Sequence, residues 1–204
     1  DVICAGGIHV AIDGTERQSI PEPNIPLALM KGQAGITSSN LFSTTSVQAV
    51  QGWDESLKSS QEYDLMFRLW QSGGAFAVDI LPRALIRERP SGQISQRNPR
   101  EKWVQLVELR AQMLSTFQNK GARNENDLQA FHQILFNHIR TLAKYDLKKA
   151  SRCYARIIKP TRFAPKHNKS AGREYVLILT IFGFYLTEKL NQWKEHLVLR
   201  IYRR

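Results

Sequence analysis

The sequence predicts an α/β fold in which a mixed sheet with accompanying helices is followed by an all-helical region. Residues 2–11 form an apolar, β-rich run, and shorter runs of this kind recur at 76–81 and 84–87. Residues 59–71 carry an apolar stripe with helical spacing, which stops at a glycine pair. From residue 98 onward, helical patterns follow one another with no strand between them. The sheet is therefore expected in the first half of the chain.

The segments that join these runs give weaker signals. The first run ends at Asp13-Gly14, which is a turn signal, and residues 17–26 hold three prolines and are expected to form a loop. Residues 27–30 suit one helical turn. Residues 33–43 suit a short strand or a loop that leads into a helix near 45–51.

The helical half begins with a start signal. The tetrapeptide Asn98-Pro99-Arg100-Glu101 places a capping residue, a proline at the first helical position and a glutamate at the third. Further helices are expected at about 127–144 and 146–158, and a last helix closes the chain after a basic linker. This change divides the chain into a sheet-containing part, residues 1–97, and a helical part, residues 98–204.

Charge divides the chain at nearly the same place. Residues 1–95 carry 7 basic and 10 acidic side chains, a net charge of −3, whereas residues 96–204 carry 22 and 8, a net charge of +14. This asymmetry implies an anionic partner for the second half, and nucleic acid and an acidic membrane surface both qualify. The two cysteines, Cys4 and Cys153, match no metal-binding spacing and indicate free thiols in a reducing cytoplasm.

Two carboxylates stand at the start of the 59–71 helix, those of Glu62 and Asp64. A carboxylate presented there could take a proton from an incoming hydroxyl group. A purely structural interpretation is also open, in which Ser59 and Glu62 form a capping box and Asp64 favours the positive end of the helix dipole. The same dipole is expected to keep Glu62 ionised at neutral pH, with modest basicity.

The order of motifs resembles the acceptor-side half of bacterial family 2 glycosyltransferases, which have a GT-A fold. The matching features are an apolar strand with an Asp-Gly turn, a small-residue loop at 35–42, the turn Gly52-Trp53-Asp54-Glu55, the segment 59–65 (SSQEYDL), Arg68-Leu69, and the segment 89–95 (RPSGQIS). The resemblance covers about residues 1–97. It implies the C-terminal half of a GT-A, Rossmann-like mixed sheet.

The resemblance also assigns roles to individual residues. The first acid of the family's helical motif is the catalytic base and falls on Glu62, although aspartate is more usual at that place. Asp64 falls on the second acid, which supports the helix start. Asp54 falls on the acid of the preceding turn and is expected as an acceptor contact or a support for one. Trp53 belongs to the same turn and is expected at the acceptor site.

Three further residues receive an expected place from the resemblance. Ser39 and Asn40, in the small-residue loop, would line the sugar or acceptor site, and the alternative is an ordinary polar loop. Arg89 stands where relatives carry a basic or histidine residue that reaches the donor diphosphate. A guanidinium suits phosphate by its bidentate geometry, and a solvated surface arginine is the alternative.

The implied activity is inverting transfer of a sugar from a nucleotide-sugar donor to a hydroxyl of a glycan or lipid-linked acceptor, in cell-surface polysaccharide or lipid-linked glycan synthesis. A divalent metal, Mn²⁺ or Mg²⁺, would neutralise the leaving diphosphate. The family's Asp-x-Asp metal motif and the nucleotide-binding half of its sheet are absent from this sequence, and the scattered histidines offer no metal site. Both missing parts are expected before Asp1, so the fragment alone is expected to be inactive.

The end of the chain is both apolar and basic. Residues 175–186 (YVLILTIFGFYL) form an apolar run that is too short to span a bilayer comfortably. A helix lying in the membrane interface fits residues 172–204, and a helix buried against its neighbours fits equally well. The expected location is the cytoplasm, at the inner face of the plasma membrane.

The competing function is a basic helical module that binds nucleic acid or another anionic partner without catalysis. The charge of the second half favours it. No helix-turn-helix, zinc or single-strand-binding motif accompanies that charge, so nucleic acid is not expected as a partner.

Overall fold

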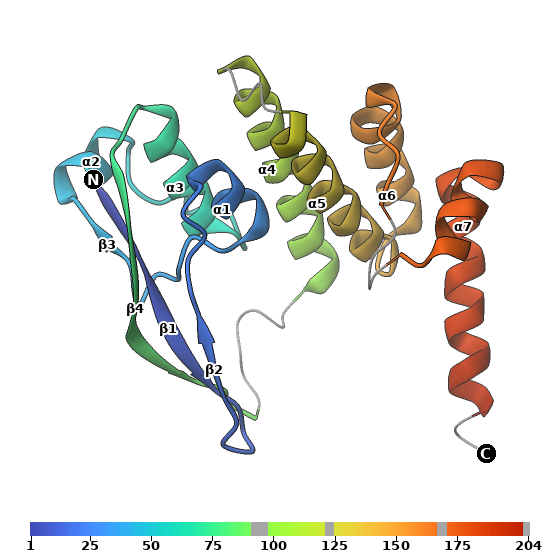
Figure 1. Ribbon diagram of the computed structural model, residues 1–204, viewed down its shortest axis with the longest axis horizontal. Coiled ribbons are helices and arrows are strands. Elements are labelled where there is room, and N and C mark those ends of the chain that lie inside the picture. The colour runs from blue at the N-terminus through green and yellow to red at the C-terminus, as the bar shows by residue number, and fades with distance from the viewer. Residues whose placement is uncertain (91–97, 121–124, 167–170, 202–204) are drawn as a thin grey trace.

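The computed structural model describes residues 1–90, 98–120, 125–166 and 171–201. Within these ranges the chain forms a four-stranded mixed sheet and seven α-helices, which confirms the expected α/β class with a helical C-terminal region. The sheet stands at one end of the molecule, helices α1 to α3 lie beside it, and the later helices extend away from it to α7 at the opposite end (Figure 1).

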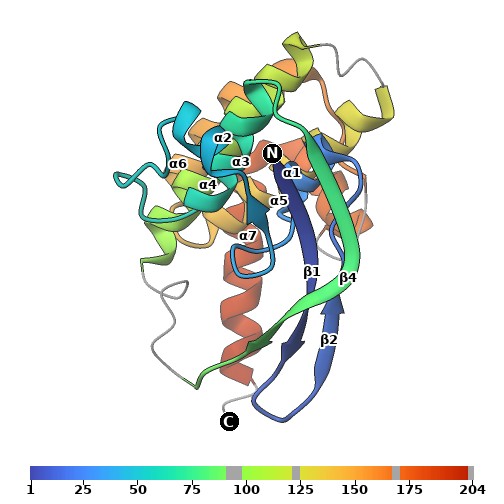
Figure 2. The same cartoon turned by 90° about the vertical axis from the view of Figure 1, so that its left-hand side faces the viewer.

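Strand β1 (Val2–Val10) is the centre of the sheet. It pairs antiparallel with β2 (Glu16–Ser19) and β3 (Leu41–Phe42). It pairs parallel with β4 (Phe76–Arg87), which follows it along its whole length. Figure 2 shows β1, β2 and β4 as a twisted layer in front of the helices.

Strand β4 is continuous where the sequence predicted two runs interrupted at Pro82. Its register against β1 slips between Ala5 and Gly7, and Pro82 pairs within that slip, where a missing amide donor is tolerated. A side chain at Gly7 would come within 2.6 Å of Ile86 Cδ1, so glycine at this position allows the two strands to approach.

Two elements correct the loop predicted at 17–26. Strand β2 pairs with β1 through its backbone, and its side chains are mostly exposed, so no apolar alternation indicates it in the sequence. Helix α1 (Ile25–Lys31) begins inside the same segment. Asn24 caps it by accepting a hydrogen bond from Leu27 N at 3.0 Å, and Pro26 suits its first turn.

Helices α2 (Thr44–Ala49) and α3 (Gln61–Gln71) lie near their predicted places. Of the apolar stripe expected in α3, Leu65, Met66 and Leu69 are buried and Trp70 is half-buried, and Phe67 is buried as well. The helix begins after Ser60, whose φ of 61° puts its backbone in the left-handed region.

The second half contains the helices that the sequence predicted. These are α4 (Pro99–Asn119), α5 (Glu125–Ala143), α6 (Leu147–Cys153), which continues through a π-helical turn (Tyr154–Ile158) and a 3-10 turn (Lys159–Thr161), and α7 (Arg173–Ile201). The backbone of α7 breaks at Gly183, which has φ 72° and ψ 173°. None of the helices in the described ranges is long and apolar enough to cross a membrane.

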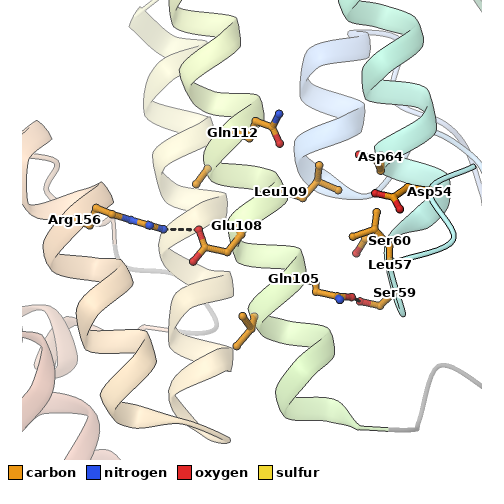
Figure 3. A pocket seen from close by; sticks show the side chains of 12 residues that line it. Asp54, Leu57, Ser59, Ser60, Asp64, Gln105, Glu108, Leu109, Gln112 and Arg156 are labelled. Atoms are coloured by element: carbon orange, nitrogen blue, oxygen red, sulfur yellow. Dashed lines mark hydrogen bonds and ion pairs between the residues drawn. The ribbon is translucent and has the colours of Figure 1, made fainter. Parts of the chain in front are cut away.

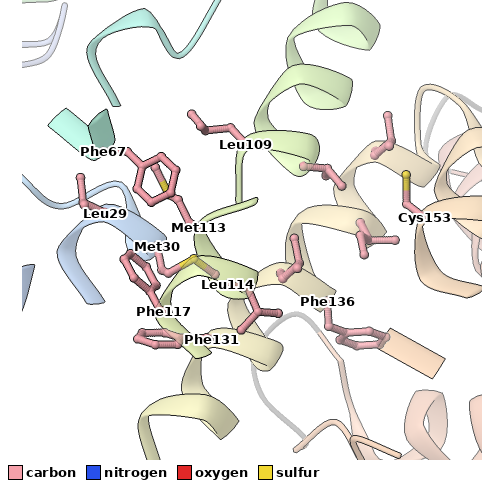
Figure 4. Packing of buried hydrophobic residues seen from close by; sticks show 14 of the residues in the cluster. Leu29, Met30, Phe67, Leu109, Met113, Leu114, Phe117, Phe131, Phe136 and Cys153 are labelled. Carbon is pink, nitrogen blue, oxygen red and sulfur yellow. The ribbon is translucent and has the colours of Figure 1, made fainter. Parts of the chain in front are cut away.

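One hydrophobic core runs across the boundary at 97/98. Phe117 of α4 packs edge-on against Phe67 and Trp70 of α3, with ring centroids 5.9 and 4.8 Å apart. It also meets Phe131 of α5 at 5.5 Å, and Met30 of α1 belongs to the same buried cluster (Figure 4). This packing fixes α4 beside α1 and α3, and cavities lie between these elements.

Candidate active site

A cavity of about 660 Å³ lies where α1, α3, α4 and α5 meet. The end of α1, the loop before α3, the first turn of α3, one face of α4 and a single side chain of α5 form its lining. Glu62 and Trp53 are both part of this lining, and so is Thr37 of the small-residue loop. The structure therefore brings the expected base and one expected acceptor contact together.

Glu62 is half-buried, and within the described part of the chain its Oε1 atom is buried without a hydrogen-bond partner. Burial raises the pKa of its carboxyl group, and a contact with Thr37 opposes this only in part. Burial, with the nearby charge of Glu62, also raises the pKa of the free thiol of Cys4 to about 11. Burial thus acts against the helix dipole and makes Glu62 a stronger base than a solvated glutamate.

The capping box expected between Ser59 and Glu62 does not form. Ser59 Oγ instead donates a hydrogen bond to Gln105 Oε1 of α4 at 2.9 Å. The capping residue of α3 is Ser60, whose side chain makes no capping hydrogen bond. Because Glu62 does not fold back onto the helix start, its carboxylate stays at the cavity.

Asp54 and Asp64 line a different cavity, of about 600 Å³, which shares Ser59 and Ser60 with the first (Figure 3). Asp54 is exposed and accepts hydrogen bonds from Oγ and N of Ser56, at 2.6 and 2.9 Å, which lower the pKa of its carboxyl group. Asp54 thus shapes the turn before α3, and the structure does not bring it to the cavity at Glu62.

Asp64 supports the same turn from the helix side. Its Oδ2 accepts a hydrogen bond from Arg68 Nε at 2.8 Å. Arg68 Nη2 also donates to the carbonyl oxygen of Gly52 at 2.8 Å, and Nη1 donates to that of Val50. The Asp64–Arg68 pair therefore ties α3 to the turn that carries Trp53.

Ser39 and Asn40 are buried and hold their loop against β1. Ser39 Oγ donates to the carbonyl oxygen of Ala5 at 2.8 Å. Asn40 Oδ1 accepts from Ala5 N at 3.1 Å, and its Nδ2 donates to the carbonyl oxygen of Ala34 at 2.9 Å. Neither side chain lines the cavity at Glu62, and Thr37 is the member of this loop that does.

Four cationic side chains that the sequence analysis did not single out also line the cavity: Lys31, Lys58, Lys102 and Arg110. Arg89, the expected diphosphate contact, lies exposed beyond the end of β4 and is not part of this lining. Two of the four cations, Lys102 and Arg110, belong to α4, whereas Lys31 ends α1 and Lys58 lies in the loop before α3.

Arg110 is 2% exposed and occupies an apolar position of α4. Its Nε donates to the carbonyl oxygen of Met30 at 3.0 Å, and its guanidinium lies 4.8 Å from the centre of the Tyr63 ring. Burial lowers the pKa of Arg110 to about 10, which still leaves it protonated at neutral pH. The sequence could have indicated Arg110 as a functional residue, because its charge interrupts the apolar stripe that continues at Met113 and Phe117.

His138 of α5 completes the lining and interrupts an apolar stripe in the same way. Burial, assisted by the positive charge of Arg110, lowers its pKa to about 4, so the ring is neutral at physiological pH. Within the described ranges its Nδ1 atom is buried without a hydrogen-bond partner.

The described residues contain no group of three or more His, Cys, Asp or Glu side chains that could hold a metal ion. These described residues therefore do not fit the expected divalent metal. Comparison with protein-family models, with curated proteins and with solved structures finds no match to this chain.

Proposed function

We propose that this chain is the acceptor-side half of an inverting family 2 glycosyltransferase with a GT-A fold, and that Glu62 is its catalytic base. The position of Glu62 is the main support. Its carboxylate lies at the first turn of α3, half-buried and with a raised pKa, in a cavity of about 660 Å³. Cavities of this size hold small ligands, and carboxylates with perturbed pKa values concentrate at functional sites.

The proposed reaction is one displacement. The acceptor hydroxyl oxygen attacks the anomeric carbon of a nucleotide sugar while its proton passes to Glu62. The bond from the anomeric carbon to the diphosphate oxygen breaks, and its electron pair leaves with the nucleoside diphosphate. The new glycosidic bond forms on the opposite face of the sugar, so the configuration inverts.

The turn before α3 supports the same interpretation. Trp53 is 41% exposed, lines the cavity and meets the Phe42 ring edge-on at 6.3 Å. An indole held at the cavity mouth offers an apolar face to the sugar ring of an acceptor. The Asp64–Arg68 pair holds this turn, so Asp64 acts on the acceptor through the position of Trp53.

The donor is assigned to residues outside this chain. Five large apolar side chains of the sheet are exposed, at 41% to 67%: Ile3, Leu41, Ile80, Leu81 and Leu85. Apolar strand surfaces normally pack on another layer. Leu85 pairs with Ile8, so it lies on the opposite face of the sheet from Ile3. We propose that the donor-binding half packs against the exposed part of β4.

The test measures sugar transfer by the chain joined to the proposed donor-binding half, with a panel of nucleotide sugars and the variant Glu62→Gln. Transfer should fall by about a hundredfold or more, because the variant cannot accept the proton, while donor binding should persist. Glu125→Gln is the matched control, since Glu125 is an exposed glutamate in the first turn of α5. Undiminished transfer by Glu62→Gln would remove Glu62 as the base.

We also propose that α7 makes a peripheral membrane contact. Tyr175, Leu179 and Phe184 of α7 are buried against the neighbouring helices. The alternative of a helix buried against its neighbours therefore holds for these residues. The helix also exposes large apolar side chains at 46% to 64%, namely Leu177, Ile181 and Phe182 before its break at Gly183 and Leu186, Leu190 and Trp193 after it. The cations Arg173, Lys189 and Lys194 are exposed on the same helix. Apolar side chains edged by cations suit an anionic lipid surface.

Vesicle flotation tests this contact with the chain itself. Binding should require anionic lipid and should weaken in the double variant Phe182→Ser, Trp193→Ser. Ile12→Ser, Ile20→Ser is the control, because both side chains are equally exposed but lie near the β1–β2 hairpin. Equal binding by all three proteins would refute the contact, and salt-sensitive binding to duplex DNA without vesicle binding would favour the basic nucleic-acid module instead.

A further inference from the structure

We infer that the cavity at Glu62 recognises an acceptor that carries a phosphate group, and that Arg110, Lys102 and Lys58 bind that group. This inference rests on the proposed function, since it names the acceptor class of the same site. It starts from the cations that the cavity gathers around a single carboxylate.

Arg110 is the central observation. The structure buries its guanidinium almost completely, and among the described residues no carboxylate lies within ion-pair distance of it. Its contacts are the carbonyl oxygen of Met30, the sulfur of Met113 at 3.7 Å and the face of Tyr63. A buried cation without a counter-ion is costly, and an anionic ligand in the cavity would supply one.

The other charged side chains of the cavity lining also favour an anionic ligand. Lys31, Lys58 and Lys102 bring the cationic side chains to four, against the one carboxylate of Glu62, so the lining carries a net charge of +3 when all five are ionised. Lys31 and Lys58 pair with Glu22 and Glu101, at 2.7 and 3.6 Å, but neither of these glutamates lines the cavity. A lining with this excess of positive charge suits a doubly charged phosphate better than a single carboxylate.

Space for the ligand lies beside Arg110. Gly32 ends α1 with φ 72°, and a side chain there would come within 3.7 Å of Arg110 Nη2 and 3.8 Å of Tyr63 Oη. Because Gly32 has no side chain, it places no atoms between the cavity and the guanidinium.

The geometry of the reaction assigns this phosphate to the acceptor. In an inverting displacement the base lies on the side of the attacking hydroxyl, and the donor diphosphate leaves from the opposite face of the anomeric carbon. An anion that shares the cavity with Glu62 therefore belongs to the molecule that brings the hydroxyl group.

Arg110 also has a structural role, since it binds a carbonyl oxygen at the end of α1, and its replacement could prevent folding. The test therefore uses the exposed Lys58 and the half-buried Lys102. Inorganic phosphate and inorganic diphosphate are titrated into the chain and the dissociation constants are measured by calorimetry. Lys58→Gln and Lys102→Gln should each weaken diphosphate binding by about tenfold, which is the effect of one lost charged hydrogen bond.

Two further variants make the result specific. Lys148→Gln removes an exposed cation of α6 that does not line the cavity, and it should bind diphosphate as the unaltered chain does. Glu62→Gln should bind diphosphate more tightly, because it removes the only negative charge of the lining. Binding that is absent, or that the four variants change equally, would overturn the inference.

The transfer assay separates this inference from the proposed function. With the chain joined to the proposed donor-binding half, Lys102→Gln should raise the KM for a phosphate-bearing acceptor about tenfold more than the KM for the same acceptor without phosphate. Comparing a soluble phosphorylated acceptor with its lipid-linked form tells which source of phosphate the site takes. Diphosphate binding with the expected variant pattern but without sugar transfer would refute the proposed reaction and support the anion site. Transfer that is indifferent to acceptor phosphate and to Lys102 would refute the anion site alone.

Discussion

Asp64 and Arg68 form an ion pair across one turn of α3, with 2.8 Å between Asp64 Oδ2 and Arg68 Nη2, and the same guanidinium binds the carbonyl oxygen of Gly52. The pair joins two segments, since it links the helix that carries Glu62 to the turn that carries Trp53. Its role is therefore to fix the distance between the proposed base and the mouth of the cavity.

Replacing Arg68 with alanine should lower the free energy of unfolding by about 1–3 kcal/mol, because two backbone carbonyl oxygens and a carboxylate lose a charged donor. Urea unfolding monitored by circular dichroism measures the change. Arg83→Ala is the control, because the Arg83–Asp79 pair has the same sequence spacing but is more exposed, and its loss should change the stability by less than about 1 kcal/mol. Equal losses in the two variants would contradict the proposed role.

Gly35→Ala should destabilise the small-residue loop. The φ of Gly35 is 74°, and an added Cβ atom would overlap Asn40 Oδ1 and lie 2.8 Å from the carbonyl oxygen of Ala5. The strained backbone alone costs about 1–3 kcal/mol, and the displaced Asn40 adds lost hydrogen bonds. Gly14→Ala is the control, with φ 84° and no atom within 4 Å of the new Cβ, so it should show the backbone cost alone in thermal unfolding.

Stability should fall on mild acidification because of His138. Burial lowers its folded-state pKa from 6.5 to about 4. Between these values the unfolded chain binds more protons than the folded chain, so the free energy of unfolding decreases as the pH falls from 6.5 to 4, by about 3 kcal/mol over the window. Urea unfolding at pH 7 and pH 5 measures this dependence, and His138→Leu should flatten it. A slope that survives in His138→Leu would assign the effect to other groups.

The rate of sugar transfer should report the raised pKa of Glu62. A base must be ionised, so the rate of transfer should fall as the pH drops through the pKa of Glu62. Because burial raises this pKa above 4.5, the ordinary value for glutamate, the acidic limb of the pH–rate profile should lie above pH 4.5. The pH profile of kcat/KM measures it. Glu62→Asp should keep a limb and part of the activity, whereas Glu62→Gln should have neither, and a limb that persists in Glu62→Gln would contradict the assignment.

The sequence predicted the elements whose side chains carry a clear pattern. The apolar run at its residues predicted β1, and apolar stripes with helical spacing predicted α3 and α4. Pro99 predicted where α4 begins. β2 was missed because its exposed residues are held by backbone pairing, which leaves no apolar pattern. The two runs around Pro82 form one strand because the register slip at Gly6 and Gly7 accommodates the proline.

The candidate site was only partly predictable, because local patterns cannot show which distant segments meet. Glu62 and Trp53 belong to one motif and share the cavity, but Asp54 and Asp64 of the same motif line its neighbour. Arg110 and His138 lie on helices that no motif connects to Glu62, and only the packing of α4 and α5 against α3 brings them there. The expected capping box failed for the same reason, since Gln105 of α4 takes the Ser59 hydroxyl.

The core that passes from α3 into α4 without interruption has a consequence for recombining this protein with its relatives. A chimera joined at 97/98 would take the proposed base, Lys31 and Lys58 from one parent and Lys102 and Arg110 from the other. The aromatic contacts of Phe117 would also have to match across the junction. The natural unit of exchange is therefore the sheet with its helices through α5, even though the sequence changes its character at residue 98.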